Sequence, residues 1–162
     1  MEVDYVIRPI QHSDNAAICS LIKDVLASYQ ANKPGTAFYD DSLKNLSQTF
    51  TEPGSGYWVA ERYKVVIGGC GIYPTDGLPA GHCELVKFYV APNVRGSGIG
   101  AALFDKACDF ARSAGYTHIY LETLPELLTG LAFYEKKGFN YLASPLGNSG
   151  HFGCSIWMEK TL

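Results

Sequence analysis

The sequence has no excess of basic charge. Its 162 residues include 13 lysines and arginines and 16 acids, which gives a formal net charge of −3. This balance provides no general attraction for nucleic acid or for an anionic membrane, so any phosphate site must be built locally. We therefore expect neither nucleic acid nor a membrane as a partner.

Long apolar runs are also missing. The first residues, MEVDYVIRPIQ, contain early acids and no continuous apolar segment of the kind found in a secretory leader. No later segment approaches the ~20 apolar residues that a membrane-spanning helix needs. These absences predict a cytoplasmic protein.

Paired cysteines are absent too. The five cysteines are odd in number and scattered, and they form no CxxC motif: Cys19, Cys70, Cys83, Cys108 and Cys154. A disulfide framework or a zinc site is therefore not expected. We predict that the protein holds no metal.

The composition, 47% hydrophobic and 18% charged residues, is typical of a globular protein. The chain has no linker or repeat, so we expect one domain over residues 1–162. Alternating patterns predict strands at residues 3–10, 56–63, 64–74, 84–90, 118–123, 139–143 and 154–162. The strands at 56–63 and 64–74 would form a hairpin closed by Pro74, Asp76 and Gly77.

Helical spacing predicts helices at residues 16–29 and 125–137, a weaker one at 42–50, and one that starts at Ile99 and ends at Gly115. The first of these would begin at Ser13 or Asp14 and place Ala17, Leu21, Val25 and Ser28 on one face. The order of elements predicts a mixed α/β domain of the α+β type with an antiparallel first half.

The stretch RGSGIG, residues 95–100, precedes the helix that starts at Ile99. Gly96, Gly98 and Ala101 match G-x-G-x-x-G/A, but a dinucleotide turn follows its strand at once and opens a βαβ unit. Here residues 91–95 intervene after an antiparallel hairpin. A Walker loop is excluded because no Gly-Lys-Ser/Thr closes it, and a plain helix cap would need only one glycine.

Three glycines allow several backbone N–H groups to point into one concavity at a helix N-terminus. Free donors and the positive end of the helix dipole bind anions there. Arg95 adds a local positive charge. A pyrophosphate fits this loop best.

RGSGIG also fits the (Gln/Arg)-x-x-G-x-(Gly/Ala) signature. Its surroundings, ELVKFYVAPNVRGSGIGAALFDKACDFARSAGYTHIYLETLP followed by FYEKKGF, resemble the core of the GNAT superfamily of acyl-CoA-dependent N-acetyltransferases. The resemblance closely covers about the C-terminal half of the chain. It implies a mixed, mainly antiparallel central sheet with helices on both faces, splayed between the fourth and fifth strands.

The resemblance further implies acetyl-CoA as the co-substrate. In the family the glycine-loop amides bind the pyrophosphate of coenzyme A; here these amides belong to Arg95, Gly96, Ser97, Gly98, Ile99 and Gly100. The preceding strand, which is bulged in the family, would place Phe88, Tyr89 and Val90 beside the pantetheine arm. One departure is Leu127, which stands where many members have an asparagine that contacts the coenzyme.

Amine attack on a thioester requires a neutral amine and benefits from a proton for the departing thiolate. By resemblance, Tyr134 in FYEKKGF is the acid that protonates this thiolate, although an aromatic core residue would show the same pattern. Several members place a glutamate base at the position of Glu84. Glu122 competes for that role, and the sequence does not decide between them.

The residues that would bind the acceptor, the molecule that carries the attacking amine, are indicated less directly. By analogy, His151 in the glycine-rich loop LGNSGHFGC and Tyr29 would contact the substrate, and Asp40 and Asp41 could attract a cationic amine. The expected reaction is acetyl transfer to a primary amine, chiefly of a small molecule. The alternative is a non-catalytic module that binds or senses acyl-CoA. A homodimer is compatible with the family.

Overall fold

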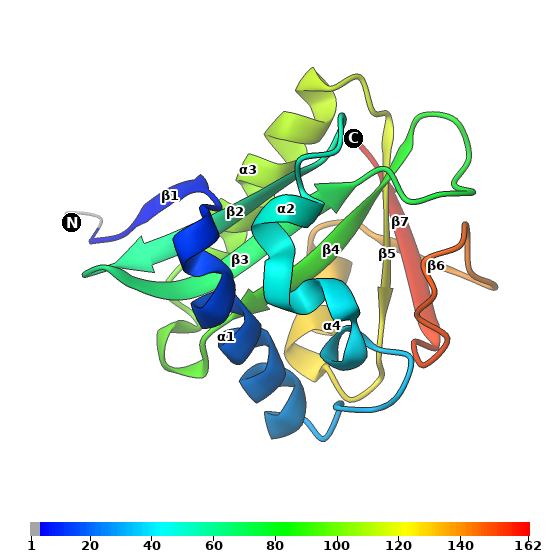
Figure 1. Ribbon diagram of the computed structural model, residues 1–162. Coiled ribbons are helices and arrows are strands. Elements are labelled where there is room, and N and C mark those ends of the chain that lie inside the picture. Colours follow the sequence, from blue (N-terminus) through cyan, green and yellow to red (C-terminus); the bar gives the residue numbers. More distant parts are fainter. Residues whose placement is uncertain (1–3) are drawn as a thin grey trace.

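The computed structural model describes residues 4–162, so Val3 of the first predicted strand lies outside the described residues. One seven-stranded sheet runs through the molecule in the order β1-β2-β3-β4-β5-β7-β6 (Figure 1). All neighbours are antiparallel except β4 and β5. The strands are β1 Val6–Pro9, β2 Gly56–Arg62, β3 Val65–Tyr73, β4 His82–Val90, β5 His118–Thr123, β6 Asn140–Leu142 and β7 Ile156–Thr161.

Helices cover both faces of the sheet (Figure 1). They are α1 Asn15–Ser28, α2 Leu46–Thr49, α3 Ile99–Ser113 and α4 Leu128–Lys136. Because side chains alternate along a strand, β2 contributes Tyr57 and Val59 to the core beneath α1, and Trp58 and Ala60 to the core beneath α3. The expected fold class, with its mainly antiparallel sheet and helices on both faces, is confirmed. No helix in residues 4–162 is long and apolar enough to cross a membrane.

The buried stripe of α3 is the one expected from its sequence. Ile99, Leu103, Ala107 and Ala111 recur every four residues and are all fully or almost fully buried. The face predicted for α1 is wrong: Ala17 and Ser28 are exposed. The buried residues of that helix are Asn15, Ile18, Ile22, Val25 and Leu26. The two isoleucines offer more apolar area than an alanine and a serine, and they turn the helix accordingly.

Three boundaries also differ from expectation. The turn between β2 and β3 is formed by Tyr63 and Lys64, both at positive φ, whereas the segment from Pro74 onward leads into β4. Helix α4 starts at residue 128 rather than 125, because a turn precedes it in which the Leu127 amide donates to the Leu124 carbonyl. Residues 42–50 form a 3-10 turn, Asp41–Asn45, followed by the short α2.

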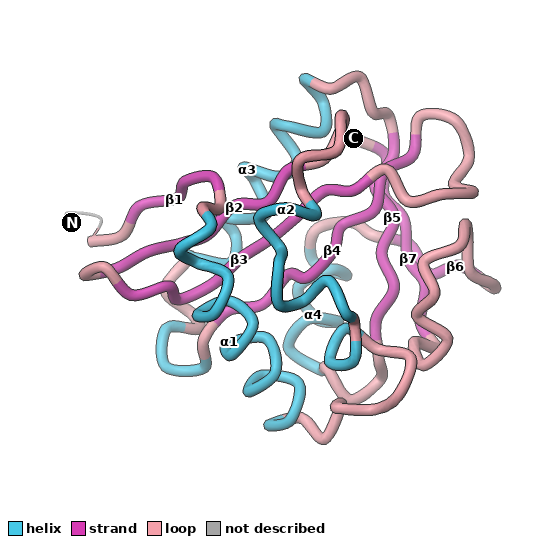
Figure 2. The backbone as a smooth tube through the Cα atoms, viewed as in Figure 1, coloured by secondary structure: helices cyan, strands magenta, loops and turns pink. Residues whose placement is uncertain are grey.

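Strands β4 and β5 pair over only part of their length. The paired residues are His82 with His118, Cys83 with Ile119 and Glu84 with Tyr120. Beyond these pairs the two strands diverge, as Figure 2 shows; β4 continues paired only with β3, and β5 only with β7. The sequence-based expectation of a splay at this point is confirmed.

A bulge interrupts β4 where the strands have separated. Gly69 of β3 faces Tyr89, whereas Gly71 faces Val86, so β4 holds an extra residue between them. Lys87 at this bulge has a φ of 50°. Its carbonyl accepts a hydrogen bond of 2.7 Å from the Tyr57 hydroxyl, which anchors the bulge to the neighbouring strands.

We expect Gly69→Ala to destabilise the protein by about 1 to 3 kcal/mol, because overpacking a filled core has that cost. A Cβ at Gly69 would lie 2.4 Å from the hydroxyl of Tyr57, which holds the bulge. Gly130→Ala is the matched control: its Cβ would find its nearest neighbour, in Tyr134, at 3.6 Å, and alanine in a helix should stabilise by about 0.4 to 1 kcal/mol. Urea unfolding measures both, and equal free energies of unfolding would contradict the role given to the Tyr57 contact.

Candidate active site

A cavity of about 360 Å³, called the larger cavity below, opens beside the diverging strands. Its wall is mostly apolar and comes from the ends of α1 and β4, from the glycine loop and from α4. The sequence-predicted residues that line it are Tyr29, Phe88, Tyr89, Val90, Arg95, Gly96, Gly98, Gly100 and Tyr134. Ile99 is buried at the start of α3, and the Ser97 hydroxyl donates to the Val94 carbonyl.

The glycine loop forms one end of this cavity. Gly96 and Gly98 have φ values of 78° and 88°, and a Cβ on either would meet no atom within 4 Å. Gly98 is the N-cap residue of α3. Within residues 4–162, none of the amides from Gly96 to Gly100 donates a hydrogen bond to a loop or cap carbonyl. These free donors and this open space fit an anionic group such as a pyrophosphate.

A chain of polar contacts links the glycine loop to α1 and α4. Arg95 donates a hydrogen bond of 2.8 Å to the Tyr29 hydroxyl, and its guanidinium lies 5.1 Å from the centre of the Tyr29 ring. The same hydroxyl lies 2.9 Å from the Thr129 hydroxyl. Tyr29, which the sequence analysis assigned to the acceptor, therefore lies in the wall of the larger cavity with Arg95.

A second cavity of about 60 Å³ lies on the other side of the splay. Its wall includes the polar side chains of Thr36, Glu84, Lys87, Glu122 and His151. Five residues line both cavities: Phe88, Tyr89, Thr123, Leu127 and Tyr134. The two cavities are thus neighbours that share a wall at the divergence of β4 and β5.

Tyr134 of α4 belongs to this shared wall. Its ring packs against Phe88, Phe133 and Phe139, and burial raises the pKa of its phenol well above the ordinary value. In the described part of the chain its hydroxyl has no hydrogen-bond partner, yet the oxygen is not fully enclosed. The hydroxyl therefore borders cavity space and is protonated at neutral pH.

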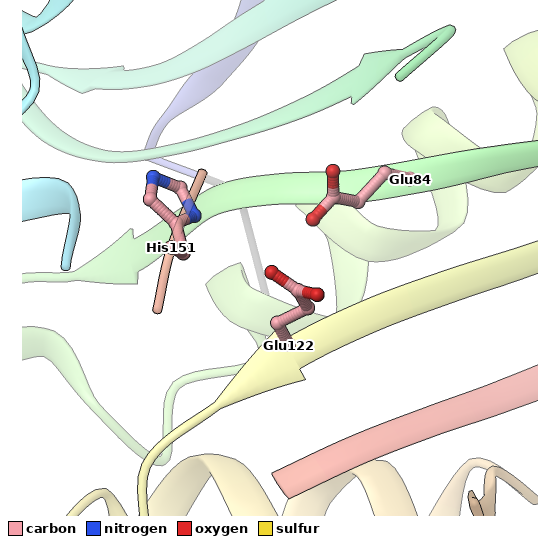
Figure 3. A group of neighbouring side chains, drawn as sticks. All are labelled: Glu84, Glu122 and His151. Atoms are coloured by element: carbon pink, nitrogen blue, oxygen red, sulfur yellow. The ribbon is translucent and has the colours of Figure 1, made fainter. Parts of the chain in front are cut away.

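Glu84, Glu122 and His151 converge on the smaller cavity (Figure 3). Glu84 comes from β4 and Glu122 from β5, and their carboxylates point toward each other across the gap between the strands. One polar atom of each of the three side chains lies within 4.8 Å of those of the other two. This spacing suits a cation. The expectation that the site holds no metal stays a prediction.

Glu84 is the most buried of the three, with 3% of its surface exposed. Burial raises its pKa to about 7, with a further contribution from the charge of Glu122, although a hydrogen bond from Thr75 opposes the shift. The Thr75 hydroxyl lies 2.5 Å from one carboxylate oxygen. A carboxylate with this pKa can take up and release a proton near neutral pH.

Glu122 is held by two hydroxyls. The Tyr120 hydroxyl donates to one of its oxygens at 2.6 Å, and Ser149 donates to the other. These two hydrogen bonds fix the orientation of the Glu122 carboxylate, whereas the pKa of Glu84 suits that residue to exchange a proton.

His151 reaches the cavity from the loop between β6 and β7. Its Nε2 lies 2.8 Å from Asp40, and Lys87 Nζ lies 2.8 Å from the same carboxylate oxygen. The hydrogen bond to Asp40 raises the pKa of His151. Burial alone would raise the pKa of Asp40, but His151 and Lys87 outweigh it and lower that pKa to about 2. Asp40 thus pairs with both cations of the smaller cavity.

The pairing of Asp40 with Lys87 and His151 carries no signal in the sequence. Lys87 and Asp40 are 47 residues apart, and His151 and Asp40 are 111 apart. Only the bulge and the folded loop bring them together. His82, by contrast, is part of neither cavity: its ring stacks on His118 and contacts Glu159.

Comparison with known proteins assigns this arrangement to a family. The Acetyltransferase (GNAT) family profile matches residues 19–139. Over 159 residues the chain is 38% identical to the uncharacterized N-acetyltransferase YjgM of Escherichia coli (strain K12), covering 97% of this chain and 95% of that protein. The chain therefore belongs to the GNAT acetyltransferase family, as its glycine loop and splayed sheet indicate.

Solved structures show the same fold. An acetyltransferase from Streptococcus agalactiae 2603 is similar with a TM-score of 0.83 at 21% identity, covering 98% of this chain and 99% of that one. The PaiA N-acetyltransferase of Thermoplasma acidophilum, solved in complex with coenzyme A, has a TM-score of 0.76 at 17% identity, covering 99% and 100%.

Proposed function

We propose that this protein transfers an acetyl group from acetyl-CoA to a primary amine of a small molecule. The observation that carries the proposal is the shared wall: two cavities of different size and polarity meet at Tyr134, where β4 and β5 diverge. A donor and an acceptor bound on the two sides would meet there. Holding two reactants in register can supply much of the rate acceleration.

The donor is assigned to the larger cavity. The free amides of residues 96–100 and the Arg95 guanidinium would hold the pyrophosphate, and Phe88, Tyr89 and Val90 would lie beside the pantetheine arm. The complex of the PaiA N-acetyltransferase with coenzyme A supports this choice of donor. Leu127 in the wall cannot offer the polar contact that an asparagine makes in many family members, so more of the binding energy rests on the loop.

The smaller cavity is assigned to the acceptor amine. An amine arrives as an ammonium ion, which the carboxylates of Glu84 and Glu122 would attract. Glu84, with a pKa of about 7, takes one proton from the nitrogen, which frees its lone pair. Glu122, held by Tyr120 and Ser149, positions the ammonium ion, with His151 beside it.

The neutral amine then attacks the thioester carbonyl, a carbon–nitrogen bond forms and the carbon–sulfur bond breaks. Tyr134 donates its phenolic proton to the departing thiolate, because its hydroxyl borders the donor cavity and is not committed to a protein partner. The nitrogen loses its second proton as the amide forms, and this proton restores the phenol of Tyr134. The proton on Glu84 leaves through the smaller cavity. No covalent intermediate with the enzyme is required.

The alternative function is a non-catalytic module that binds acyl-CoA. It would need the larger cavity alone, whereas a buried carboxylate with a pKa near neutrality and a free tyrosine hydroxyl serve turnover. Release of free thiol from acetyl-CoA with a panel of amines tests the proposal. Binding of coenzyme A without thiol release for any amine would favour the module.

Four further expectations stay predictions: the single domain over residues 1–162, the cytoplasmic location, the absence of nucleic-acid and membrane partners, and a homodimer.

We expect Gly98→Ala to weaken coenzyme A binding by about tenfold or more, because a Cβ at positive φ costs about 1 to 2 kcal/mol and would tilt the loop amides. Gly115→Ala is the matched control at the other end of α3: its φ is 90° and it has the same open surroundings. Both variants should lose similar unfolding free energy, but only the first should lose affinity in calorimetric titration with coenzyme A. Equal affinities would remove the loop from the pyrophosphate site.

We expect Tyr134→Phe to lower kcat about 100-fold, the usual contribution of a general acid, with little change in the affinity for coenzyme A. The ring and its packing are kept, so the fold should be unaffected. Tyr141→Phe, at an exposed position outside both cavities, controls for the loss of a hydroxyl. Unchanged thiol release in Tyr134→Phe would contradict the role of this residue.

For the wild type we expect log(kcat/KM) to fall about one unit per pH unit below pH 7, because the base form of Glu84 is the ionised form and its pKa is raised to about 7. Glu84→Gln should remove this acid limb and lower the plateau about 100-fold or more. Glu159→Gln, whose carboxylate contacts His82 outside the cavities, should keep the limb. An acid limb that survives in Glu84→Gln would transfer the role to another group.

A further inference from the structure

The charges around the smaller cavity restrict what the acceptor can carry. The described residues that line it include only two cationic side chains, Lys87 and His151. Both are bound to the same carboxylate, Asp40, at 2.8 Å each. Asp40 therefore already offsets part of the positive charge that a negative group of a ligand would need.

The remaining charge in this cavity is negative. Glu84 and Glu122 face each other across the splay, and no cationic side chain pairs with either of them in residues 4–162, apart from the adjacent His151 (Figure 3). With Glu84 ionised and His151 protonated, three carboxylates including Asp40 face two cations, which leaves one uncompensated negative charge. One ammonium ion would cancel it, whereas a zwitterion would not.

The geometry around Asp40 opposes a rearrangement that would free Lys87. The ammonium group of Lys87 is almost fully buried, and its backbone is held at positive φ in the bulge. The Tyr57 hydroxyl fixes the carbonyl of the same residue. To release Lys87 for a ligand, the partly buried Asp40 would have to lose one of its two cationic partners, which is unfavourable.

The small size of this cavity also disfavours an acceptor with a carboxylate beside the amine. About 60 Å³ accommodates an amino group and a short stretch of chain. A carboxylate on the carbon next to the reacting nitrogen would have to share this space with Glu84 and Glu122. Like charges this close repel strongly, and the splay excludes much of the water that would screen them.

Resting on the proposed acetyl transfer, we propose that the acceptor is a primary amine without a carboxylate beside the reacting nitrogen, such as an alkyl or arylalkyl amine, and that free α-amino acids are rejected. The carboxylates of Glu84 and Glu122 and the pairing of Lys87 and His151 with Asp40 set this selectivity.

Two series of three compounds separate charge from bulk: tyramine, L-tyrosinamide and L-tyrosine, and pentylamine, L-norleucinamide and L-norleucine. Within each series the amide has the branch of the amino acid without its negative charge. We expect the amine and the amide to exceed the amino acid in kcat/KM by about 100-fold, because a buried site rejects a charge that it cannot pair. A loss that appears already in the amide would assign the selectivity to bulk and overturn the proposal.

Substitution of Glu122 tests whether this residue sets the selectivity. Glu122→Gln keeps the shape of the side chain and removes the charge that would face the substrate carboxylate, so the ratio of amide to amino acid should fall about tenfold, whatever the change in rate. Glu159→Gln should leave the ratio unchanged. If both variants keep the wild-type ratio, Glu122 does not set it.

Binding of the same six compounds to the protein saturated with coenzyme A, measured by calorimetry, keeps the inference testable without turnover. If no compound releases thiol but the amines bind more tightly than the amino acids, the transfer proposal fails and the selectivity stands. If the amino acids are acetylated as well as the amides, the transfer proposal stands and the selectivity is wrong. Absence of binding by all six compounds overturns the assignment of the cavity.

Discussion

The separation of β4 from β5 after their third pair is the constraint on which both cavities depend. Pairing between these parallel strands ends at Glu84 and Tyr120, and beyond it their facing edges become cavity walls, while β4 stays paired with β3 and β5 with β7. The larger cavity takes the end of β4, the glycine loop and α4 as its wall. The smaller one takes the facing side chains of the two strands. A sheet paired to its end would have room for neither.

The bulge at Lys87 links this opening to the loop that precedes α2. The positive φ of Lys87 turns its carbonyl to Tyr57 and allows its ammonium group to reach Asp40. Asp40 in turn orients His151 from the far end of the chain. This backbone irregularity therefore determines which charges surround the smaller cavity. This coupling explains why the cations there are paired within the protein, while the carboxylates of Glu84 and Glu122 face the cavity.

Local patterns predicted the elements in which one spacing dominates. The helix after the glycines and the strand HIYLET have their expected places, because the apolar stripe of α3 and the alternation of β5 each fit a single period. The face of α1 was predicted wrongly, because Ala17 fits the helical spacing but Ile18 and Ile22 bury more apolar area. The start of α4 was predicted too early, because the residues before it form a turn in which the Leu127 amide donates to the Leu124 carbonyl.

By itself, the sequence determined the family, the glycine loop and the identity of the residues proposed for chemistry, because these depend on motifs of neighbouring residues such as RGSGIG and FYEKKGF. The tertiary structure decided the arrangement of those residues. It places Tyr29 in the wall of the larger cavity and pairs Asp40 with His151 and Lys87. It also gives the two facing glutamates different surroundings, because Glu84 is buried and Glu122 accepts hydrogen bonds from two hydroxyls. Burial and pairing depend on contacts between distant segments, so their effects on pKa and on ligand charge arise only in the folded chain.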